Sequence, residues 1–258
     1  MEFKNLIVNK EGKVGFITLN NPSKMNPINS EVEVEIHYVL NAWEDDSEVR
    51  CVVITGSGRA FSSGVDRKTL KASHERSPYG VYEDINKTTK LIYRLSTYPK
   101  PTIAAINGLA LGLGLVLAMA CDLRVASDDA SMGAVFVKIG LSSDNGGSYL
   151  LTRLVGLSKA LEMLFTGEII PSQQAKEIGL VNRVFPREEF QQATLELATK
   201  IANHSPVAIR FLKASAYKSI KNDLDTVMDF ESAAQALVIH STEHRQAVQG
   251  FLKKGENH

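Results

Sequence analysis

The N-terminal part of the chain shows two hydrophobic patterns, one typical of strands and one typical of amphipathic helices. Residues 2–8 and 13–19 alternate or cluster β-forming side chains around Glu11-Gly12, which predicts a hairpin. After Ser30, apolar side chains recur at helical spacing. Ser30 and Glu33 together match a capping box, so we expect a helix to begin at Ser30.

The middle of the chain continues as an alternation of apolar strands and helices. Residues 49–55 form a continuous apolar run, as expected of a strand in a parallel sheet that helices cover on both faces. Such alternation predicts an α/β fold with crossover connections. The elements expected next are a helix through 85–95, a strand at 102–106, a helix after Gly112 and a strand at 123–126.

The C-terminal part has a different pattern. From Glu188 onward the periodicity is almost wholly helical, with breaks at 204–206 and near Ser241. A chain of 258 residues, 44% hydrophobic and 22% charged, can bury a substantial core as an ordinary globular protein. We therefore expect a core domain over residues 1–195 and a C-terminal helical region over residues 196–258.

Charge and composition argue against several classes of function. Lys+Arg and Asp+Glu balance at 29 each, so no overall field favours nucleic acid or an anionic membrane as a partner. The first residues lack the pattern of a signal peptide, and the longest apolar run, 109–121, is too short to span a bilayer. Cys51 and Cys121 lie in apolar segments and are predicted to be buried free thiols. The expected location is the cytoplasm.

Two glycine-containing segments are candidates for binding a negatively charged oxygen. They are Ser63-Gly64-Val65-Asp66 and Gly112-Leu113-Gly114, the second at an expected helix start. Glycines let the backbone approach a ligand closely, and two preorganised N–H groups stabilise an enolate-like oxygen in a dry site. A helix N-terminus adds a positive dipole end. Each segment taken alone is more typical of a tight turn, and only the two together favour an oxyanion site.

Together with the stretch from Pro99 to Val155, these segments resemble the crotonase (enoyl-CoA hydratase/isomerase) family over nearly the whole chain. The resemblance rests on the segments 61–66 and 99–114, on Ala120-Cys121-Asp122, and on Gly-Leu-Ser-Ser-Asp-Asn-Gly-Gly at 140–147. It implies an α/β fold, a spiral of repeated ββα units followed by a helical trimerisation region. It also implies a homotrimer or a dimer of trimers, and an acyl-CoA thioester as substrate. Coenzyme A is then part of the substrate, and neither a separate cofactor nor a metal is expected.

By position in the family motif, the N–H groups of Val65 and Leu113 would form the oxyanion hole. The two glutamates of the family's hydratases correspond to Val116 and Phe136, and neither of these side chains can carry a proton. Asp144 is the carboxylate that remains in this region. Its motif most resembles the phenylacetate-pathway ring-enoyl-CoA isomerases.

Asp144 has two interpretations from its surroundings. Beside Phe136, Ile139 and Leu141, a carboxyl would be desolvated and its pKa raised, which suits a group that removes and returns a carbon-bound proton. Alternatively, Asp144 caps the helix expected over 146–154.

We expect the enzyme to shift a double bond in an acyl-CoA through a dienolate, with Asp144 as acid/base. The alternatives are a hydratase of unsaturated or cyclic acyl-CoA using Asp144 alone and a catalytically silent acyl-CoA-binding protein. A nucleophilic Asp144, as in 4-chlorobenzoyl-CoA dehalogenases, is disfavoured. The Trp and His of those enzymes correspond to Phe136 and Tyr93 here.

The resemblance also implies a set of contacts to the coenzyme A portion. Lys24 can meet a phosphate as a point charge or remain a solvated loop lysine. Tyr79 and Tyr82 lie in the variable segment 67–90, which is expected to line the acyl pocket. His240-Ser241-Thr242-Glu243-His244 fits an inverted zinc-protease signature but lacks a supporting fold context. The expected contacts to coenzyme A are Lys24, Met25, Ser63 and Asp66, with Phe251 and Lys254 reaching the ligand of a neighbouring subunit.

Overall fold

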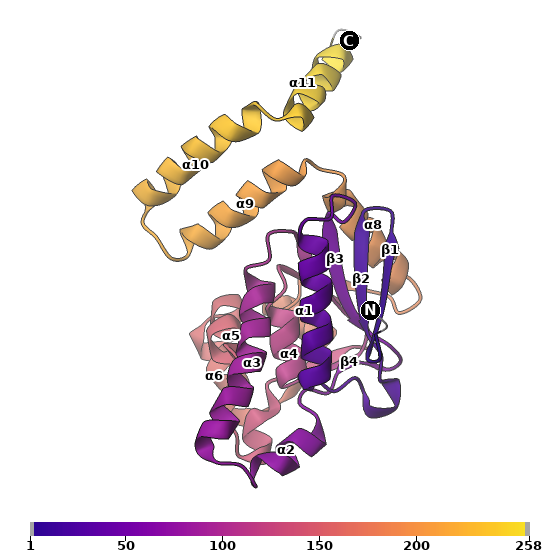
Figure 1. Cartoon of the computed structure of the whole chain (residues 1–258), viewed down its shortest axis with the longest axis vertical. Helices are drawn as coiled ribbons and strands as arrows, with labels where there is room; N and C mark the ends of the chain where they lie inside the picture. The colour runs from indigo at the N-terminus through magenta and orange to yellow at the C-terminus, as the bar shows by residue number, and fades with distance from the viewer. Residues whose placement is uncertain (1–2, 256–258) are drawn as a thin grey trace.

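Two β-sheets organise the chain in the computed structural model, which describes residues 3–255 (Figure 1). The larger sheet has six strands in the order β1-β2-β3-β5-β7-β10. β1 and β2 form the expected antiparallel hairpin, and every other neighbouring pair in this sheet is parallel. The strands are β1 (Leu6–Glu11), β2 (Val14–Leu19), β3 (Cys51–Gly56), β5 (Thr102–Ile106), β7 (Leu123–Ser127) and β10 (Arg183–Phe185).

A smaller, four-stranded sheet has the order β4-β6-β8-β9. Its first three strands each follow a strand of the larger sheet along the chain: β4 follows β3, β6 follows β5 and β8 follows β7. Helical segments come after each of these pairs, so the ββα repeat and the α/β class expected from the sequence are confirmed. The short strands are β4 (Ala60–Ser62), β6 (Leu109–Leu111), β8 (Ser131–Gly133) and β9 (Ile169–Pro171).

The helices follow the expected order, and the first begins at Ser30 as predicted, but its capping residue differs. The N-cap of the first helix is Asn29, whose side chain accepts a hydrogen bond from the Val32 N–H. The prediction of Ser30 as the cap was therefore wrong by one residue. The helices are α1 (Ser30–Glu44), α2 (Arg67–Ser73), α3 (Pro78–Ser96), α4 (Leu113–Met119), α5 (Gly147–Val155), α6 (Leu157–Thr166), α7 (Ser172–Glu177), α8 (Phe190–Ala202), α9 (Pro206–Ser219), α10 (Leu224–Ile239) and α11 (Thr242–Gly255), with short 3-10 turns η1 (Pro22–Lys24) and η2 (Val135–Ile139).

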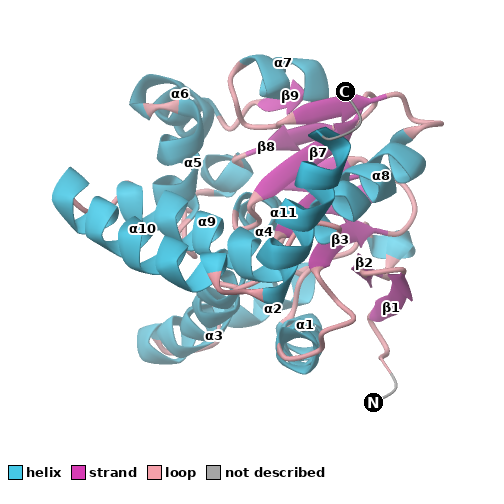
Figure 2. Ribbon diagram, turned by 90° about the horizontal axis from the view of Figure 1, so that it is seen from above, coloured by secondary structure: helices cyan, strands magenta, loops and turns pink. Residues whose placement is uncertain are grey.

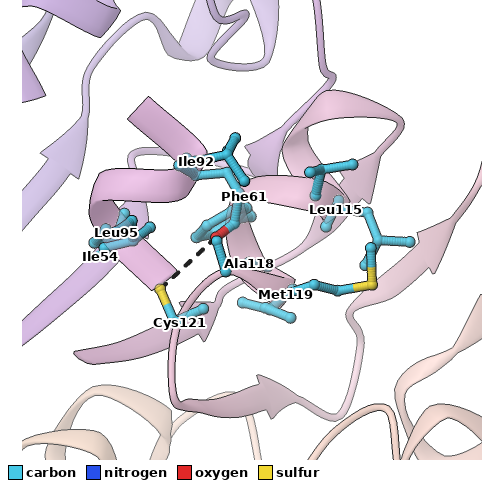
Figure 3. Close-up of a cluster of buried hydrophobic side chains, with 14 of the residues drawn as sticks. Ile54, Phe61, Ile92, Leu95, Leu115, Ala118, Met119 and Cys121 are labelled. Carbon is cyan, nitrogen blue, oxygen red and sulfur yellow. Dashed lines mark hydrogen bonds between the residues drawn. The ribbon is translucent and has the colours of Figure 1, made fainter. Parts of the chain in front are cut away.

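Both faces of the larger sheet are buried at its central strands, where successive residues point to opposite sides and enter different clusters. Val52 and Ile54 of β3 belong to the main core, which also includes residues of α1, α3 and α4. Cys51 and Val53 belong to a second cluster, which α8 covers from the other side (Figure 2). Figure 3 shows part of the main core, where α4 packs against Phe61 and where Cys121 Sγ lies 3.7 Å from the Leu117 carbonyl oxygen.

The last three helices extend away from the sheets and form an arm at one end of the molecule (Figure 1). α9 is tied to the core through Asp122, whose carboxylate accepts hydrogen bonds from Lys213 and Tyr217. Residue 195, the expected end of the core domain, lies inside α8, and the residues of this helix beyond it still pack on the sheet. None of the helices in residues 3–255 has the length and apolar character that crossing a membrane requires.

Candidate functional site

The first candidate donor, Val65, lies on a loop that is fixed by the segment before α1. The Ile28 N–H donates to the Gly64 carbonyl oxygen at 2.8 Å, and the Asp66 N–H donates to the Ile28 carbonyl oxygen at 3.1 Å. These two bonds form a short parallel bridge between Ile28 and Val65. The Val65 N–H points to the side of the backbone opposite these two bonds. The loop is therefore rigid, and its central amide is available to a ligand.

The second candidate donor, Leu113, is the first residue of α4. Gly112 precedes it with a positive φ of 50°, a conformation that favours glycine. Gly64 lies close by: a Cβ built on it would be 2.7 Å from the Leu111 carbonyl oxygen and 3.3 Å from the Leu113 nitrogen. The fold thus brings the two donor loops into direct contact.

Neither amide has an acceptor within residues 3–255, as the Val65 and Leu113 N–H groups donate to no other group there. Both residues are nevertheless well packed, since Leu113 is 7% exposed and Val65 packs against the main core. Two fixed, unused N–H groups close together form the arrangement that can stabilise a developing oxyanion. Their assignment as an oxyanion hole stays a prediction.

An apolar wall lies beside this pair of amides. Val116, on α4, is fully buried, and the Phe136 ring packs against the same core. A Cβ built on Gly147 would be 2.9 Å from Val116 Cγ2 and 3.9 Å from Phe136 Cζ. The two side chains that correspond to the hydratase glutamates therefore lie near one point, although the atom nearest to that point is Ser143 Oγ, at 2.6 Å. Neither Val116 nor Phe136 can hold or deprotonate a water molecule.

Asp144 lies in the turn before α5, close to this wall. Its Oδ1 is buried and has no hydrogen-bond partner within the described chain, and the same is true of Ser143 Oγ. Burial raises the pKa of the Asp144 carboxyl, while the Asn145 amide beside it acts in the opposite direction. Buried polar atoms without partners are costly and uncommon, which points to a role in binding or chemistry.

The alternative role of Asp144, capping α5, was a wrong prediction. The N-cap residue of α5 is Gly146, and no side chain caps this helix. Asp144 contributes only its backbone carbonyl oxygen, which accepts from the Gly147 N–H at 2.8 Å. Its carboxylate therefore makes no hydrogen bond that caps the helix.

Asn145 and Thr89 were missed by the sequence reasoning. Asn145 is 7% exposed and has a positive φ of 51°, and its Oδ1 accepts a hydrogen bond from Thr89 Oγ1 at 3.0 Å. The Asn-Gly-Gly sequence was a visible sign of a tight turn. Its partner on α3 could not be found from the sequence, because the contact joins residues far apart along the chain.

The residues expected to contact coenzyme A gather around the Val65 loop. The Ser63 N–H donates to the Met25 carbonyl oxygen at 2.8 Å, and Ser63 Oγ lies 3.4 Å from the Lys24 carbonyl oxygen. The Lys24 side chain is exposed, and Asp66 caps α2 by accepting from the Lys68 N–H. These residues form one contiguous surface, and their contacts to a ligand stay predictions.

Asn26 is a further residue that the sequence reasoning did not use for the site. It is 1% exposed, has a positive φ of 52°, and donates to the carbonyl oxygens of Ser57 and Ala60. Its own carbonyl oxygen accepts from Ser62 Oγ at 2.8 Å. Asn26 therefore holds the segment before α1 against the Val65 loop.

Two expected contacts and two aromatic side chains lie elsewhere. Phe251 is exposed on α11, at the end of the molecule opposite α2, and the side chain of Lys254 lies outside the described residues (Figure 1). Within a single copy of the chain, Phe251 therefore lies away from the Val65 loop.

Tyr79 and Tyr82 are exposed near the start of α3, with ring centroids 6.4 Å apart. Over residues 3–255, no three His, Cys, Asp or Glu side chains are grouped so as to hold a metal ion.

Comparisons with known proteins agree on one family. The sequence profile of the enoyl-CoA hydratase/isomerase family matches residues 9–258. The chain is 37% identical to the short-chain-enoyl-CoA hydratase of Clostridium acetobutylicum, covering 98% of this chain and 97% of the relative. It is 32% identical to the 1,2-epoxyphenylacetyl-CoA isomerase of Escherichia coli, with the same coverage. The crystal structure of an enoyl-CoA hydratase from Bacillus anthracis superimposes with a TM-score of 0.92 at 33% identity, covering 97% of both chains.

Proposed function

The chain belongs to the enoyl-CoA hydratase/isomerase (crotonase) family, and on that basis we propose that it moves a carbon–carbon double bond in an enoyl-CoA thioester between the β,γ and α,β positions. Members of this family act on acyl-CoA thioesters. In the proposed reaction, Asp144 is the acid/base, and the N–H groups of Val65 and Leu113 bind the thioester oxygen. Coenzyme A belongs to the substrate, and the reaction needs no further cofactor.

The reaction balances within the substrate and one carboxylate. Asp144 removes a proton from C2 of a β,γ-enoyl thioester, and the electron pair of that C–H bond moves into a dienolate whose negative oxygen faces the two amides. The double bond shifts as Asp144 returns the proton to C4, giving the α,β-enoyl thioester. Because one group takes up and returns the proton, a raised pKa that brings the carboxyl closer to neutral pH favours both steps.

The observation that carries this proposal is the combination of a buried, unpartnered Asp144 Oδ1 with the apolar side chains Val116 and Phe136. A double-bond shift needs a proton carrier and an oxyanion site, whereas hydration also needs a bound and deprotonated water. The apolar wall opposes the second reaction and leaves the first possible.

Hydration of an enoyl-CoA by Asp144 alone is the second candidate. It is favoured by the 37% identity to a short-chain-enoyl-CoA hydratase, which exceeds the 32% identity to the epoxyphenylacetyl-CoA isomerase. The loss of both glutamate positions argues against it. A third outcome is a protein that binds acyl-CoA without catalysis.

We also propose that the active assembly is a homotrimer or a dimer of trimers. Large apolar side chains are exposed on α9 and α10, which is unusual for a surface that faces only water. The exposed Phe251 of α11 then lies near the coenzyme A of a neighbouring copy. We further propose that the protein is located in the cytoplasm.

The decisive experiment compares wild type and Asp144→Asn on three substrates: a β,γ-enoyl-CoA, an α,β-enoyl-CoA and a saturated acyl-CoA. The proposed isomerase interconverts the first two, and Asp144→Asn lowers turnover by about 10²–10⁴-fold while still binding the saturated thioester in calorimetry. Wild-type turnover in Asp144→Asn would refute the role of Asp144. Formation of a 3-hydroxyacyl-CoA at an enzymatic rate would favour the hydratase, and binding without turnover would favour the silent protein.

A further inference from the structure

A polar connection joins α3 to the turn that carries Asp144. Thr89, in the middle of α3, donates from Oγ1 to Asn145 Oδ1 over 3.0 Å. The same Thr89 hydroxyl lies 3.0 Å from the Ile85 carbonyl oxygen, the usual partner of a threonine within a helix. One hydroxyl proton is therefore shared between the helix and the turn.

The backbone of this turn is unusual at the same place. Asn145 has a φ of 51° and Gly146 a φ of 79°, so two successive residues are in the left-handed region. A non-glycine residue in this region costs about 1–2 kcal/mol, although asparagine tolerates it better than most. The asparagine side chain is also 7% exposed, and a polar side chain this deeply buried requires a partner.

From these contacts we infer that Thr89 and Asn145 are positioning residues for Asp144: Thr89 binds the oxygen of the Asn145 side chain and thereby fixes the turn that carries the Asp144 carboxyl. This inference rests on the proposed function, because it gives Asp144 an acid/base role. The amide orients the carboxyl toward the substrate and stabilises its charged form, so that burial does not make Asp144 too weak an acid to return the proton.

The electrostatics agree with this arrangement. Burial raises the pKa of Asp144, and the largest opposing contribution is the hydrogen bond of the Asn145 side chain. Within the part of the chain that the structure describes, no charged group contributes to this pKa. α4 carries no titratable side chain. The titratable side chains on the other elements around the turn are Tyr79, Tyr82, Glu83, Asp84, Lys87, Lys90, Tyr93 and Arg94 in α3, Lys138 in η2, Tyr149 and Arg153 in α5, and Lys159 and Glu162 in α6.

The test measures the pH dependence of kcat/KM for Thr89→Val, Thr89→Ser and Asn145→Gly against wild type. Thr89→Val keeps the shape of the side chain and removes the hydroxyl, and Asn145→Gly keeps the left-handed backbone and removes the amide. We expect both to move the lower apparent pKa of the profile upward by about half to one unit, the effect of one neutral hydrogen bond. Thr89→Ser should restore the wild-type profile.

Thr97→Val is the matched control. Thr97 is the C-cap residue of α3 and, like Thr89, donates to a carbonyl oxygen one turn earlier, that of Tyr93 at 2.8 Å, but it does not touch the Asp144 turn. Its profile should equal that of wild type. The inference is overturned if Thr89→Val and Asn145→Gly keep the wild-type apparent pKa, or if Thr97→Val shifts it equally. Should Asp144→Asn instead retain full turnover, the proposed function itself fails, and the two failures are thereby distinguished.

Discussion

Gly64 lies directly against the backbone nitrogen of Leu113, with a φ of 91° that favours glycine. A methyl group there would be 2.7 Å from the Leu111 carbonyl oxygen and 3.3 Å from the Leu113 nitrogen. The spacing of the two candidate oxyanion donors therefore depends on the absence of a side chain at position 64.

Gly64→Ala is expected to push the two donor loops apart. We predict a fall in kcat/KM of about 10²–10³-fold, comparable to the loss of one oxyanion donor, together with reduced thermal stability. Gly12→Ala is the control, because Gly12 also has a positive φ, of 56°, but a Cβ there would meet nothing within 4 Å. Equal activity losses in the two variants would show that backbone strain, and not donor spacing, is responsible.

Asp144→Asn is expected to increase stability at neutral pH while it lowers turnover. Burial raises the folded-state pKa of this carboxyl above the ordinary 3.8, so its charged form destabilises the folded state at any pH above the folded-state pKa. Removing that charge should raise the Tm at pH 7.

The increase in Tm of Asp144→Asn over wild type should shrink as the pH falls through the folded-state pKa of Asp144. It should vanish below pH 3.8, where Asp144 of wild type is protonated in both the folded and the unfolded state. Differential scanning calorimetry from pH 8 downward measures this. If the increase in Tm did not depend on pH, the stabilisation would come from packing and not from removal of the charge.

Lys213→Met is expected to loosen the C-terminal arm. Lys213 Nζ lies 2.6 Å from Asp122 Oδ2, with side-chain exposures of 12% and 17%, and it also donates to the Lys100 carbonyl oxygen. Removing one partner of a largely buried ion pair leaves the other uncompensated, so we predict that the free energy of unfolding falls by about 2–3 kcal/mol. Denaturant unfolding measures it, with the exposed Lys200→Met on α8 as a control that should change little.

Cys51 and Cys121 are expected to be unreactive in the folded protein. Both are buried free thiols, and burial raises the pKa of each to about 12. Because the thiolate is the reactive form, a disulfide reagent at pH 8 should label neither cysteine in native protein and both in denaturant. Rapid labelling without denaturant would show that the sheet opens easily.

The central strands of the larger sheet could be predicted because they are buried on both faces and are therefore continuously apolar, as in Val52 to Ile54. The three-residue strands β4, β6, β8 and β9 are too short to produce a periodic signal. Asn29 and Ser30 are both good capping residues, and only the backbone conformation decides between them.

Within the site, residue types could be predicted but partners could not. The glycine loops and Asp144 follow from local sequence and family resemblance. Thr89 and Asn145 meet only because α3 passes beside the turn before α5, and nothing in either segment encodes that approach. The burial of Asp144 Oδ1 likewise depends on tertiary packing, and the backbone of the turn makes Gly146, not Asp144, the N-cap residue of α5.

The buried position of Asp144 Oδ1 has a consequence for the fate of hydrogen isotopes. An oxygen that water does not reach and that no protein group binds exchanges a captured proton slowly with the solvent. In the proposed isomerisation, a deuterium placed at C2 would then travel with the carboxyl and arrive at C4 of the same molecule. The product would retain its label in ordinary water, and the fraction retained would report how well the site is sealed.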